Sequence, residues 1–159
     1  MNYESFNNEF YILYPKLVRT TSFICIKKQD AINISKESMV DAYVNWKKFS
    51  DSTEALFFGK ANAIKKIFDK NKSDVETSDK HINLTLIEDL EKNVIHFSSP
   101  QILEALFNLP LKERIAITLS YIDQESENTI SKLMGIKLVE AKSLLKNASD
   151  ILEFQLRTS

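Results

Sequence analysis

The sequence predicts an all-α protein made of two small helical domains joined by an extended acidic linker. Apolar residues recur three and four positions apart over most of the chain, which is the spacing of one face of a helix. Only two glycines and three prolines occur in 159 residues, too few for a fold rich in strands and turns. Residues 73–99 break the helical period. We therefore place a three-helix domain at 1–72, the linker at 73–99 and a helix-turn-helix domain at 100–159.

The first predicted helix lies between about Glu4 and Lys28 and is rich in apolar and aromatic side chains. One helical face carries Phe6, Phe10, Leu13 and Leu17. Proline cannot donate its backbone nitrogen to a helix, so we expect a kink or a restart at Pro15.

Two more helices complete the first domain. The second runs from about Asp30 to Lys48, with Asp30 as a plausible N-cap, and it carries Ala31, Ile34, Ser38, Met39, Ala42, Tyr43 and Trp46. A loop from Phe49 to Thr53 follows, and Ser52 or Thr53 is the expected cap of the third helix, at about 54–70. Its inward residues are expected to be Leu56, Phe57, Ala61, Ile64, Ile67 and Phe68.

The linker between the domains has an acidic composition. From Ser73 to Ser99 its acids are Asp74, Glu76, Asp79, Glu88, Asp89 and Glu91, against Lys80 and Lys92. The segment LTLIEDLEKN is a candidate for a short helix within it. His81 and His96 have no partners at metal-ligand spacing, so we expect no metal site.

The second domain shows a helix-turn-helix pattern. Apolar residues at helical spacing predict helices at about 111–121 and from about 137 onward, with a short helix between them. Ser126 stands in an N-cap position before that short helix. Gly135 follows it directly, and glycine tolerates the left-handed conformation that a sharp turn needs. A helix, a tight glycine turn and a second helix make a helix-turn-helix.

Composition excludes several classes of function. The formal net charge is −1, so the chain is not a strongly basic nucleic-acid binder. A single cysteine, Cys25, cannot form an internal disulfide, and its apolar surroundings favour inert packing. No phosphate loop, nucleophile motif or metal-ligand cluster is present, so we expect neither enzyme activity nor a cofactor. The N-terminal residues lack a signal-peptide pattern and no apolar run is long enough to span a bilayer, which leads us to expect a cytoplasmic protein with no membrane partner.

The helix-turn-helix segment resembles region 4 of bacterial RNA polymerase sigma factors of the extracytoplasmic-function type. That family typically carries a Leu-Pro opening, an Arg, a Tyr that closes the helix, and a Ser-capped helix ending in Leu-Gly-Ile. These features fall here on Leu109, Pro110, Arg114, Tyr121, Ser126, Met134 (in place of Leu), Gly135 and Ile136. The Lys-Ser pair of the family's recognition helix falls on Lys142 and Ser143, and its usual Ala on Ala148.

The first domain resembles region 2 of the same family. The family's opening, an apolar helix that contains a Tyr-Pro-like break, corresponds to YILYPKLVRTTSFI, and the start of its next helix corresponds to Asp30-Ala31. The family's ending Ala-aromatic-x-x-Trp matches Ala42, Tyr43 and Trp46, and its next helix matches Leu56, Phe57 and Asn62. Both resemblances occur in the family's order.

The resemblance implies three binding surfaces and no catalytic residue. The second helix would dock on a coiled coil of the largest subunit of core RNA polymerase through Asp30, Asn33, Glu37 and Asp41. The loop and third helix would hold the melted promoter strand through Phe49, Ser50, Asp51, Ser52, Lys60, Asn62, Lys65 and Lys66. The recognition helix would enter the major groove with Lys137, Val139, Glu140, Lys142, Ser143, Lys146 and Asn147, while its domain grips the polymerase flap.

Departures from the family pattern allow more than one mode of action. Arg is common in the family where Leu144 and Asn147 stand, and Glu140 would repel phosphate, so we expect diluted DNA contacts. The helix could read an A/T-rich element through Lys and Asn, or the domain could mainly grip the flap. A second DNA-bound partner, such as an RNA-guided effector, could instead choose the site. The chain could also be a polymerase-binding adaptor that does not melt DNA, a regulator controlled by an anti-sigma factor, or a dimeric helix-turn-helix repressor.

Overall fold

The computed structural model describes residues 1–73 and 100–158. Every regular element in these two ranges is a helix, which confirms the predicted all-α class. The expectations for residues 74–99, including His81, His96 and the short helix, lie outside the described residues.

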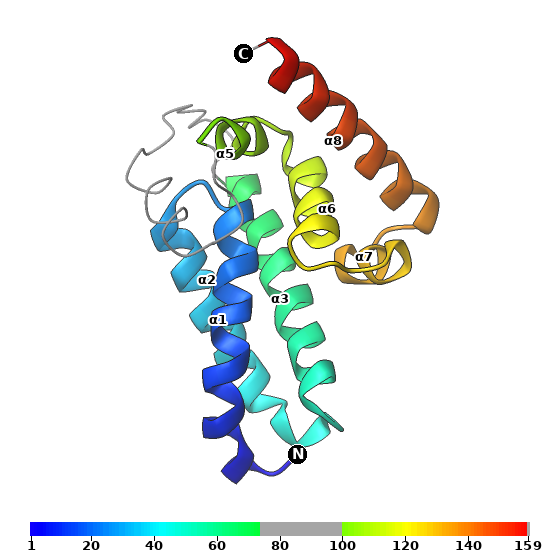
Figure 1. Ribbon diagram of the computed structural model, residues 1–159. Helices are drawn as coiled ribbons and strands as arrows, with labels where there is room; N and C mark the ends of the chain where they lie inside the picture. Colours follow the sequence, from blue (N-terminus) through cyan, green and yellow to red (C-terminus); the bar gives the residue numbers. More distant parts are fainter. Residues whose placement is uncertain (74–99, 159) are drawn as a thin grey trace.

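Three long helices dominate residues 1–73, the first half of the molecule (Figure 1). They are α1 (Phe6–Ile24), α2 (Lys28–Val44) and α3 (Ser52–Ser73), with short 3-10 turns η1 (Tyr3–Ser5) and η2 (Trp46–Lys48). Figure 1 shows them side by side and alternating in direction. Each buries the apolar face expected from its spacing, although Phe57 remains 37% exposed.

Small side chains let α1 and α2 approach closely. Ala31 and Ser35 of α2 are fully buried, and Oγ1 of Thr21 lies 2.8 Å from Oγ of Ser35. A kink or a restart was predicted at Pro15; the helix does not restart there, because α1 continues through that residue. Proline removes the hydrogen bond to the carbonyl of Tyr11, and Tyr11 and Pro15 both lie on the exposed side, where water can replace it.

Aromatic rings fill the end of the three-helix bundle near the N-terminus. Trp46 is fully buried and packs edge-to-face on Phe6, with ring centroids 5.0 Å apart. Its indole nitrogen donates to Oγ of Ser5 over 3.1 Å, so the buried donor is satisfied. This cluster fixes how the chain passes from α2 into α3.

Two of the predicted caps are displaced by a few residues. Helix α2 begins at Lys28, so Asp30 lies in its first turn and forms an ion pair with Lys70 of α3, at 2.7 Å. Helix α3 begins at Ser52, and the acceptor at its start is Asp51, whose Oδ1 accepts from the backbone nitrogen of Glu54 over 2.9 Å. The predictions of Asp30 as an N-cap and of Ser52 or Thr53 as the next cap were therefore wrong in position.

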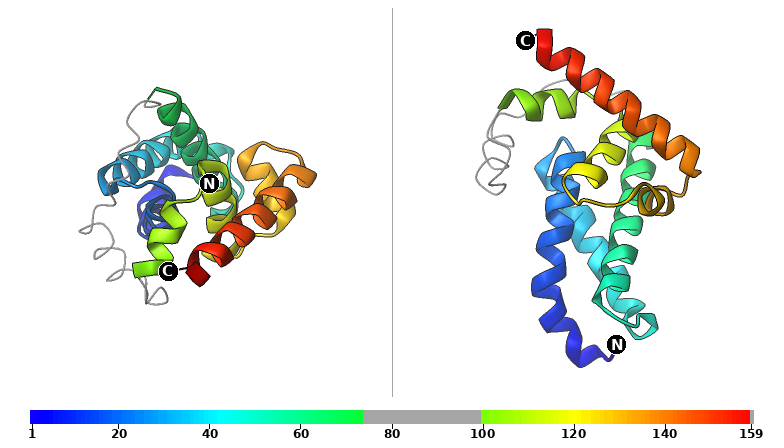
Figure 2. Two further views of the ribbon diagram at one scale, coloured as in Figure 1. Left: turned by 90° about the horizontal axis from the view of Figure 1, so that it is seen from above. Right: turned by 45° about the vertical axis from the view of Figure 1, so that its right-hand side comes forward.

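Residues 100–158 form the second half of the molecule. Their helices are α5 (Pro100–Phe107), α6 (Leu111–Tyr121), α7 (Glu127–Met134) and α8 (Leu138–Thr158). Figure 2 shows α7 beside α3 and α8 crossing on the outer side of α6.

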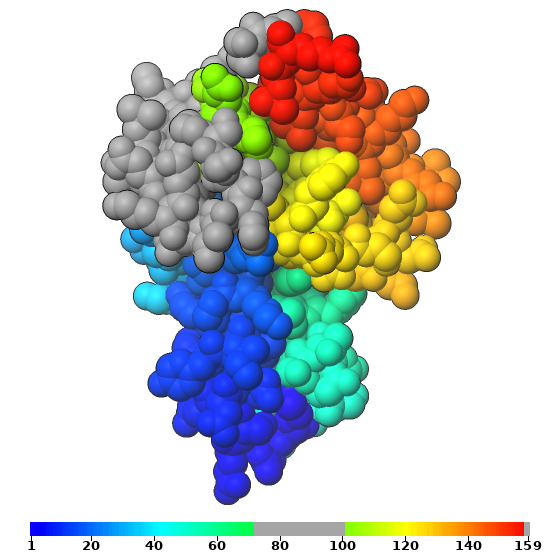
Figure 3. All heavy atoms as spheres, in the orientation of Figure 1, coloured from blue at the N-terminus to red at the C-terminus, as the bar shows by residue number. Residues whose placement is uncertain are grey.

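The two halves pack directly against each other. Helix α6 contacts α1, and α7 contacts α3. One buried cluster joins Leu17 and Ile64 of the first half to Ile115 and Leu133 of the second. A second cluster joins Phe23 to the apolar residues of α5 and α6. Figure 3 shows the α6–α7 segment lying against the atoms of α1 and α3. The expected pair of separate domains is thus not confirmed, because the halves share their cores.

Candidate nucleic-acid interface

Helices α6, α7 and α8 form the predicted helix-turn-helix. Oγ of Ser126 accepts from the backbone nitrogen of Thr129 over 3.2 Å, which confirms Ser126 as the N-cap of α7. Gly135 ends α7 with φ 66°, in the left-handed region. The backbone nitrogen of Ile136 then donates to the carbonyl of Ser131 over 3.0 Å, a bond typical of a helix that stops at a left-handed glycine.

The outer face of α8 and the residue just before it carry the predicted DNA-reading side chains. These side chains reach the surface along one face, namely Lys137, Val139, Glu140, Lys142, Ser143, Lys146 and Asn147. The opposite face packs on α6 and α7 through Ala141, Leu144 and Ala148. The helix therefore presents one polar face that is anchored from behind.

Two charges on this face have partners within the motif. Nζ of Lys142 lies 3.8 Å from Glu127, and Oε1 of Glu140 lies 3.7 Å from Nζ of Lys112. These side chains are roughly half exposed and the distances are long, so water screens both pairs strongly. The pairs do not prevent Lys142 from meeting another anion.

Leu144 requires a correction. It is 7% exposed and belongs to the buried cluster, so its position faces the core and not a DNA groove. The lack of an Arg at Leu144 is therefore no evidence of diluted base reading. Only Glu140 and Asn147 remain as departures on the exposed face.

The loop before α3, which was predicted to bind the melted strand, is held by contacts with α3 itself. Phe49 is 8% exposed and packs on Phe58, with ring centroids 5.2 Å apart, so it is not available to stack on a base in this arrangement. Ser50 donates through both its backbone nitrogen and its hydroxyl to Glu54. These hydrogen bonds lower the pKa of the Glu54 carboxyl.

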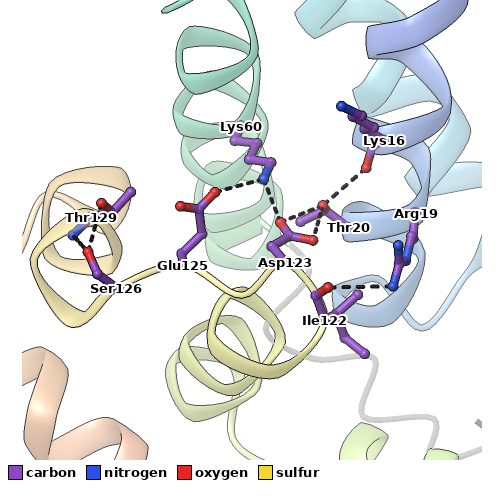
Figure 4. Close-up of polar contacts among 9 residues, drawn as sticks. All are labelled: Lys16, Arg19, Thr20, Lys60, Ile122, Asp123, Glu125, Ser126 and Thr129. Carbon is purple, nitrogen blue, oxygen red and sulfur yellow. Dashed lines mark hydrogen bonds and ion pairs between the residues drawn. The ribbon is translucent and has the colours of Figure 1, made fainter. Parts of the chain in front are cut away.

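Lys60, predicted to meet DNA phosphate, is buried between the two halves (Figure 4). Its Nζ lies 2.9 Å from Oδ2 of Asp123 and 3.0 Å from Oε1 of Glu125. Oγ1 of Thr20 lies 2.7 and 2.9 Å from the two carboxylate oxygens of Asp123. We call Thr20, Lys60, Asp123 and Glu125 the Lys60 cluster. The prediction of Lys60 as an exposed phosphate contact does not hold in this arrangement.

The remaining predicted strand-binding residues of α3 are more accessible. Lys65 is exposed, and Lys66 pairs with Asp41 at 3.2 Å and with Glu37 at 3.7 Å. Asn62 is partly buried, and its Oδ1 has no hydrogen-bond partner among the described residues. The loop residues Ser50 and Asp51 are exposed, with Ser52 partly so.

The predicted polymerase-binding residues lie on two different sides of α2. Asp30, Glu37 and Asp41 lie along the edge that meets the lysines of α3. Asn33 lies on the open face and accepts from Nε2 of Gln29 over 2.9 Å. Two exposed valines, Val40 at 61% and Val44 at 67%, continue that open face.

Sequence reasoning missed the Lys60 cluster, and it missed that the buried Arg114 donates hydrogen bonds to the carbonyls of Phe107 and Leu109. A signal for Lys60 was present, because it stands at helical spacing between the inward residues Leu56 and Ile64. A lysine on an apolar stripe needs a buried partner. The acids Asp123 and Glu125, in a short loop of the other half, were candidates for that partner.

The comparisons with known proteins add no identification. No protein-family model matches the chain, and a search of the curated proteins gives no match. Among the described residues, no group of three or more His, Cys, Asp or Glu side chains is placed to hold a metal ion. Within the same residues, no helix has the length and apolarity required to cross a membrane.

Proposed function

We propose that this chain is a transcription initiation factor of the extracytoplasmic-function sigma type, which binds core RNA polymerase and directs it to promoter DNA. The observation that supports this most is the helix-turn-helix. Its turn closes at Gly135, and the outer face of α8 presents the seven residues expected to face a major groove. An anchored helix with a polar outer face is suited to insertion into DNA.

In the proposed working state, two helical domains at 1–72 and 100–159 engage their targets separately, tied by the acidic linker at 73–99. The protein acts in the cytoplasm, where polymerase and promoter are found. The packed arrangement of the two halves is then one state of the chain, and the separated arrangement is another.

The open face of α2 is the proposed surface for polymerase. Val40 and Val44 offer apolar area, and Asn33 and Glu37 flank it with polar groups. An apolar centre with a polar rim is the usual composition of a protein–protein interface.

A second candidate function, from another class, is that of a polymerase-binding adaptor that does not melt DNA. Two observations favour it: Phe49 is held in the aromatic cluster, and Lys60 is neutralised by two carboxylates. Both residues belong to the predicted strand-binding surface. For such an adaptor, a second DNA-bound partner, such as an RNA-guided effector, selects the site.

Transcription with purified core polymerase over a random promoter library tests the proposal. If the chain is an initiation factor, the promoters that produce transcripts should share two sequence elements. Permanganate should then detect unpaired thymines at the start site. Polymerase binding without thymine reactivity supports the adaptor instead. Binding to paired half-sites as a homodimer, without polymerase, would identify a repressor.

A further inference from the structure

A pocket of about 200 Å³ lies between three helices of the second half. Helices α5 and α6 both contact α8 (Figure 2), and side chains of all three helices line the pocket. Most of the lining side chains are aliphatic, namely Ile102, Leu106, Ile117, Ile122 and Leu152. The other lining residues are Thr118 and Tyr121, each of which carries a hydroxyl group.

Thr118 brings a buried hydroxyl without a partner to this pocket. The residue belongs to the last turn of α6 and is 1% exposed. A threonine inside a helix can bond the carbonyl four residues earlier, yet Oγ1 of Thr118 has no hydrogen-bond partner among the described residues. A buried hydroxyl without a partner is unfavourable, so a molecule that supplies one is stabilised here.

Water is a poor occupant of such a pocket. An ordered buried water needs roughly two to four polar partners, whereas most of this wall is aliphatic. Apolar cavities stay dry and take up apolar molecules instead. The pocket therefore suits an organic molecule with an apolar body and a single polar group.

The volume and the lining residues limit the class of that molecule. A protein cavity of about 150 Å³ accommodates benzene, while pockets for drug-sized ligands measure about 300–1,000 Å³. A pocket of about 200 Å³ thus fits one ring with one or two further atoms and excludes a nucleotide. The lining residues that the structure describes include no ionic side chain, and burying an unpaired charge is costly, so the ligand is neutral.

Tyr121 lies at the solvent side of the pocket. Its side chain is 68% exposed, so a molecule can enter beside it. An aromatic ligand can also pack against the ring of Tyr121. A rigid ring loses no internal rotation on binding, which favours it over a flexible chain of the same volume.

We infer that the pocket between α5, α6 and α8 is a binding site for a small neutral aromatic molecule with one hydroxyl group, of the phenol class. The ring contacts the aliphatic wall, and the ligand hydroxyl shares a hydrogen bond with Thr118. The ligand also contacts Leu152 of α8, so it adds contacts between α6 and α8. This inference does not depend on the proposed function, because binding requires neither polymerase nor DNA.

Methyl NMR of the full chain, titrated with two compounds of equal size, tests the site. The compounds are para-cresol, which carries the hydroxyl, and para-xylene, which has a methyl group in its place. With either compound the methyl signals of Ile117, Ile122 and Leu152 should shift saturably. Those of Ile34 and Ile67, buried in the first half, should not move.

Thr118→Val removes the hydroxyl and keeps the shape of the side chain. It should weaken the binding of para-cresol by about two- to tenfold, the loss expected for one hydrogen bond. It should not weaken the binding of para-xylene, which has no hydroxyl to lose.

A larger side chain in the wall should block the site. Ile102→Phe, at a partly exposed lining residue, should abolish the binding of both compounds. Ile12→Phe makes the same substitution at an exposed position on α1 and should leave both affinities unchanged. If Ile102→Phe does not fold by circular dichroism, Leu152→Phe, at another partly exposed lining residue, should show the same loss.

Absence of saturable shifts in the wild-type chain, up to the solubility limit of both compounds, would overturn the site. Binding that survives a pocket-filling substitution would place the ligand elsewhere and would also overturn it. Equal loss of affinity for the two compounds in Thr118→Val would overturn the assignment of the hydroxyl and with it the phenol class.

Discussion

The side chain of Arg114 donates a hydrogen bond to Phe107 at the C-terminal end of α5. Its Nη1 donates to the carbonyl oxygen of Phe107, the last residue of that helix, and to that of Leu109, each over 3.0 Å. Arg114 is buried, and burial lowers the pKa of its guanidinium from the ordinary value, although arginine remains charged in proteins. One buried side chain thus satisfies carbonyls that a helix end leaves without partners.

Arg114→Met should lower the free energy of unfolding by about 3 kcal/mol, because the substitution leaves two buried carbonyls unpaired. Lys112→Met, two residues earlier and exposed, is the control and should change it by less than about 0.5 kcal/mol. Urea unfolding followed by circular dichroism measures both. Equal stability of the two variants would contradict the role assigned to Arg114.

The two glycines should respond in opposite directions to the same substitution. Gly135→Ala should destabilise the fold by about 1 kcal/mol, because φ 66° is unfavourable for alanine even though its Cβ meets no atom within 4 Å. Gly59→Ala should stabilise it by about 0.5–1 kcal/mol, because it lies inside α3 and its Cβ would make an ordinary contact with Leu17 at 3.7 Å. Thermal unfolding of both variants measures the two changes, and a shift of the same sign in both would contradict this account.

Cys25 should be unreactive in the native protein. Burial raises the pKa of its thiol to about 12, and the nearby Asp30 carboxylate adds to the shift. At pH 8 a disulfide reagent such as Ellman's reagent should modify Cys25 only after unfolding in urea. Rapid reaction of the folded protein would show that Cys25 is accessible.

The raised pKa of the Cys25 thiol makes the free energy of unfolding fall as the pH rises. In the unfolded chain the thiol loses its proton near its ordinary pKa of about 8.5, while the folded chain retains it until about pH 12. The contribution of Cys25 to stability is therefore complete below about pH 8.5 and falls as the pH rises toward 12. Unfolding of the wild-type chain and Cys25→Ala across this range should show a steeper loss of stability in the wild type, and identical slopes would contradict it.

The lysines on the outer face of α8 predict how the affinity for DNA depends on salt concentration. If Lys146 meets phosphate, Lys146→Ala should weaken binding to duplex promoter DNA and reduce the slope of log K against log salt by about 1. Lys16→Ala, an exposed lysine on α1, should leave the slope unchanged. Fluorescence anisotropy over a salt series, with polymerase present, measures both variants. An unchanged slope for Lys146→Ala would remove this residue from the interface.

The elements that follow local rules could be predicted from the sequence. The helical class, the cap at Ser126 and the turn at Gly135 depend on spacing and backbone conformation within a few residues. The exposed face of α8 also follows from its period alone. For Leu144 the helical spacing and the family pattern gave different predictions. The spacing places it on the apolar stripe and the family pattern places it toward DNA, and the residue lies in the core.

The contacts between the halves could not be predicted in the same way. Lys60 and Asp123 come from segments that are far apart in sequence. The spacing of apolar residues within a helix does not indicate which faces of the two halves meet. The resemblance to a two-domain family favoured separate modules, whereas the apolar side chains of α1, α3, α6 and α7 gain by being buried together. Arg114 was noticed only as a motif residue, and its hydrogen bonds depend on where α5 ends.

The affinity of the purified chain for core RNA polymerase tests the proposed function most directly. Biolayer interferometry with immobilised core enzyme should show saturable binding by the wild-type chain. Val40→Glu, which places a charge on the open face of α2, should weaken that binding, while Val139→Glu, the same change on the outer face of α8, should weaken it much less. Absence of binding by the wild-type chain, in a preparation that is folded by circular dichroism, would contradict the account.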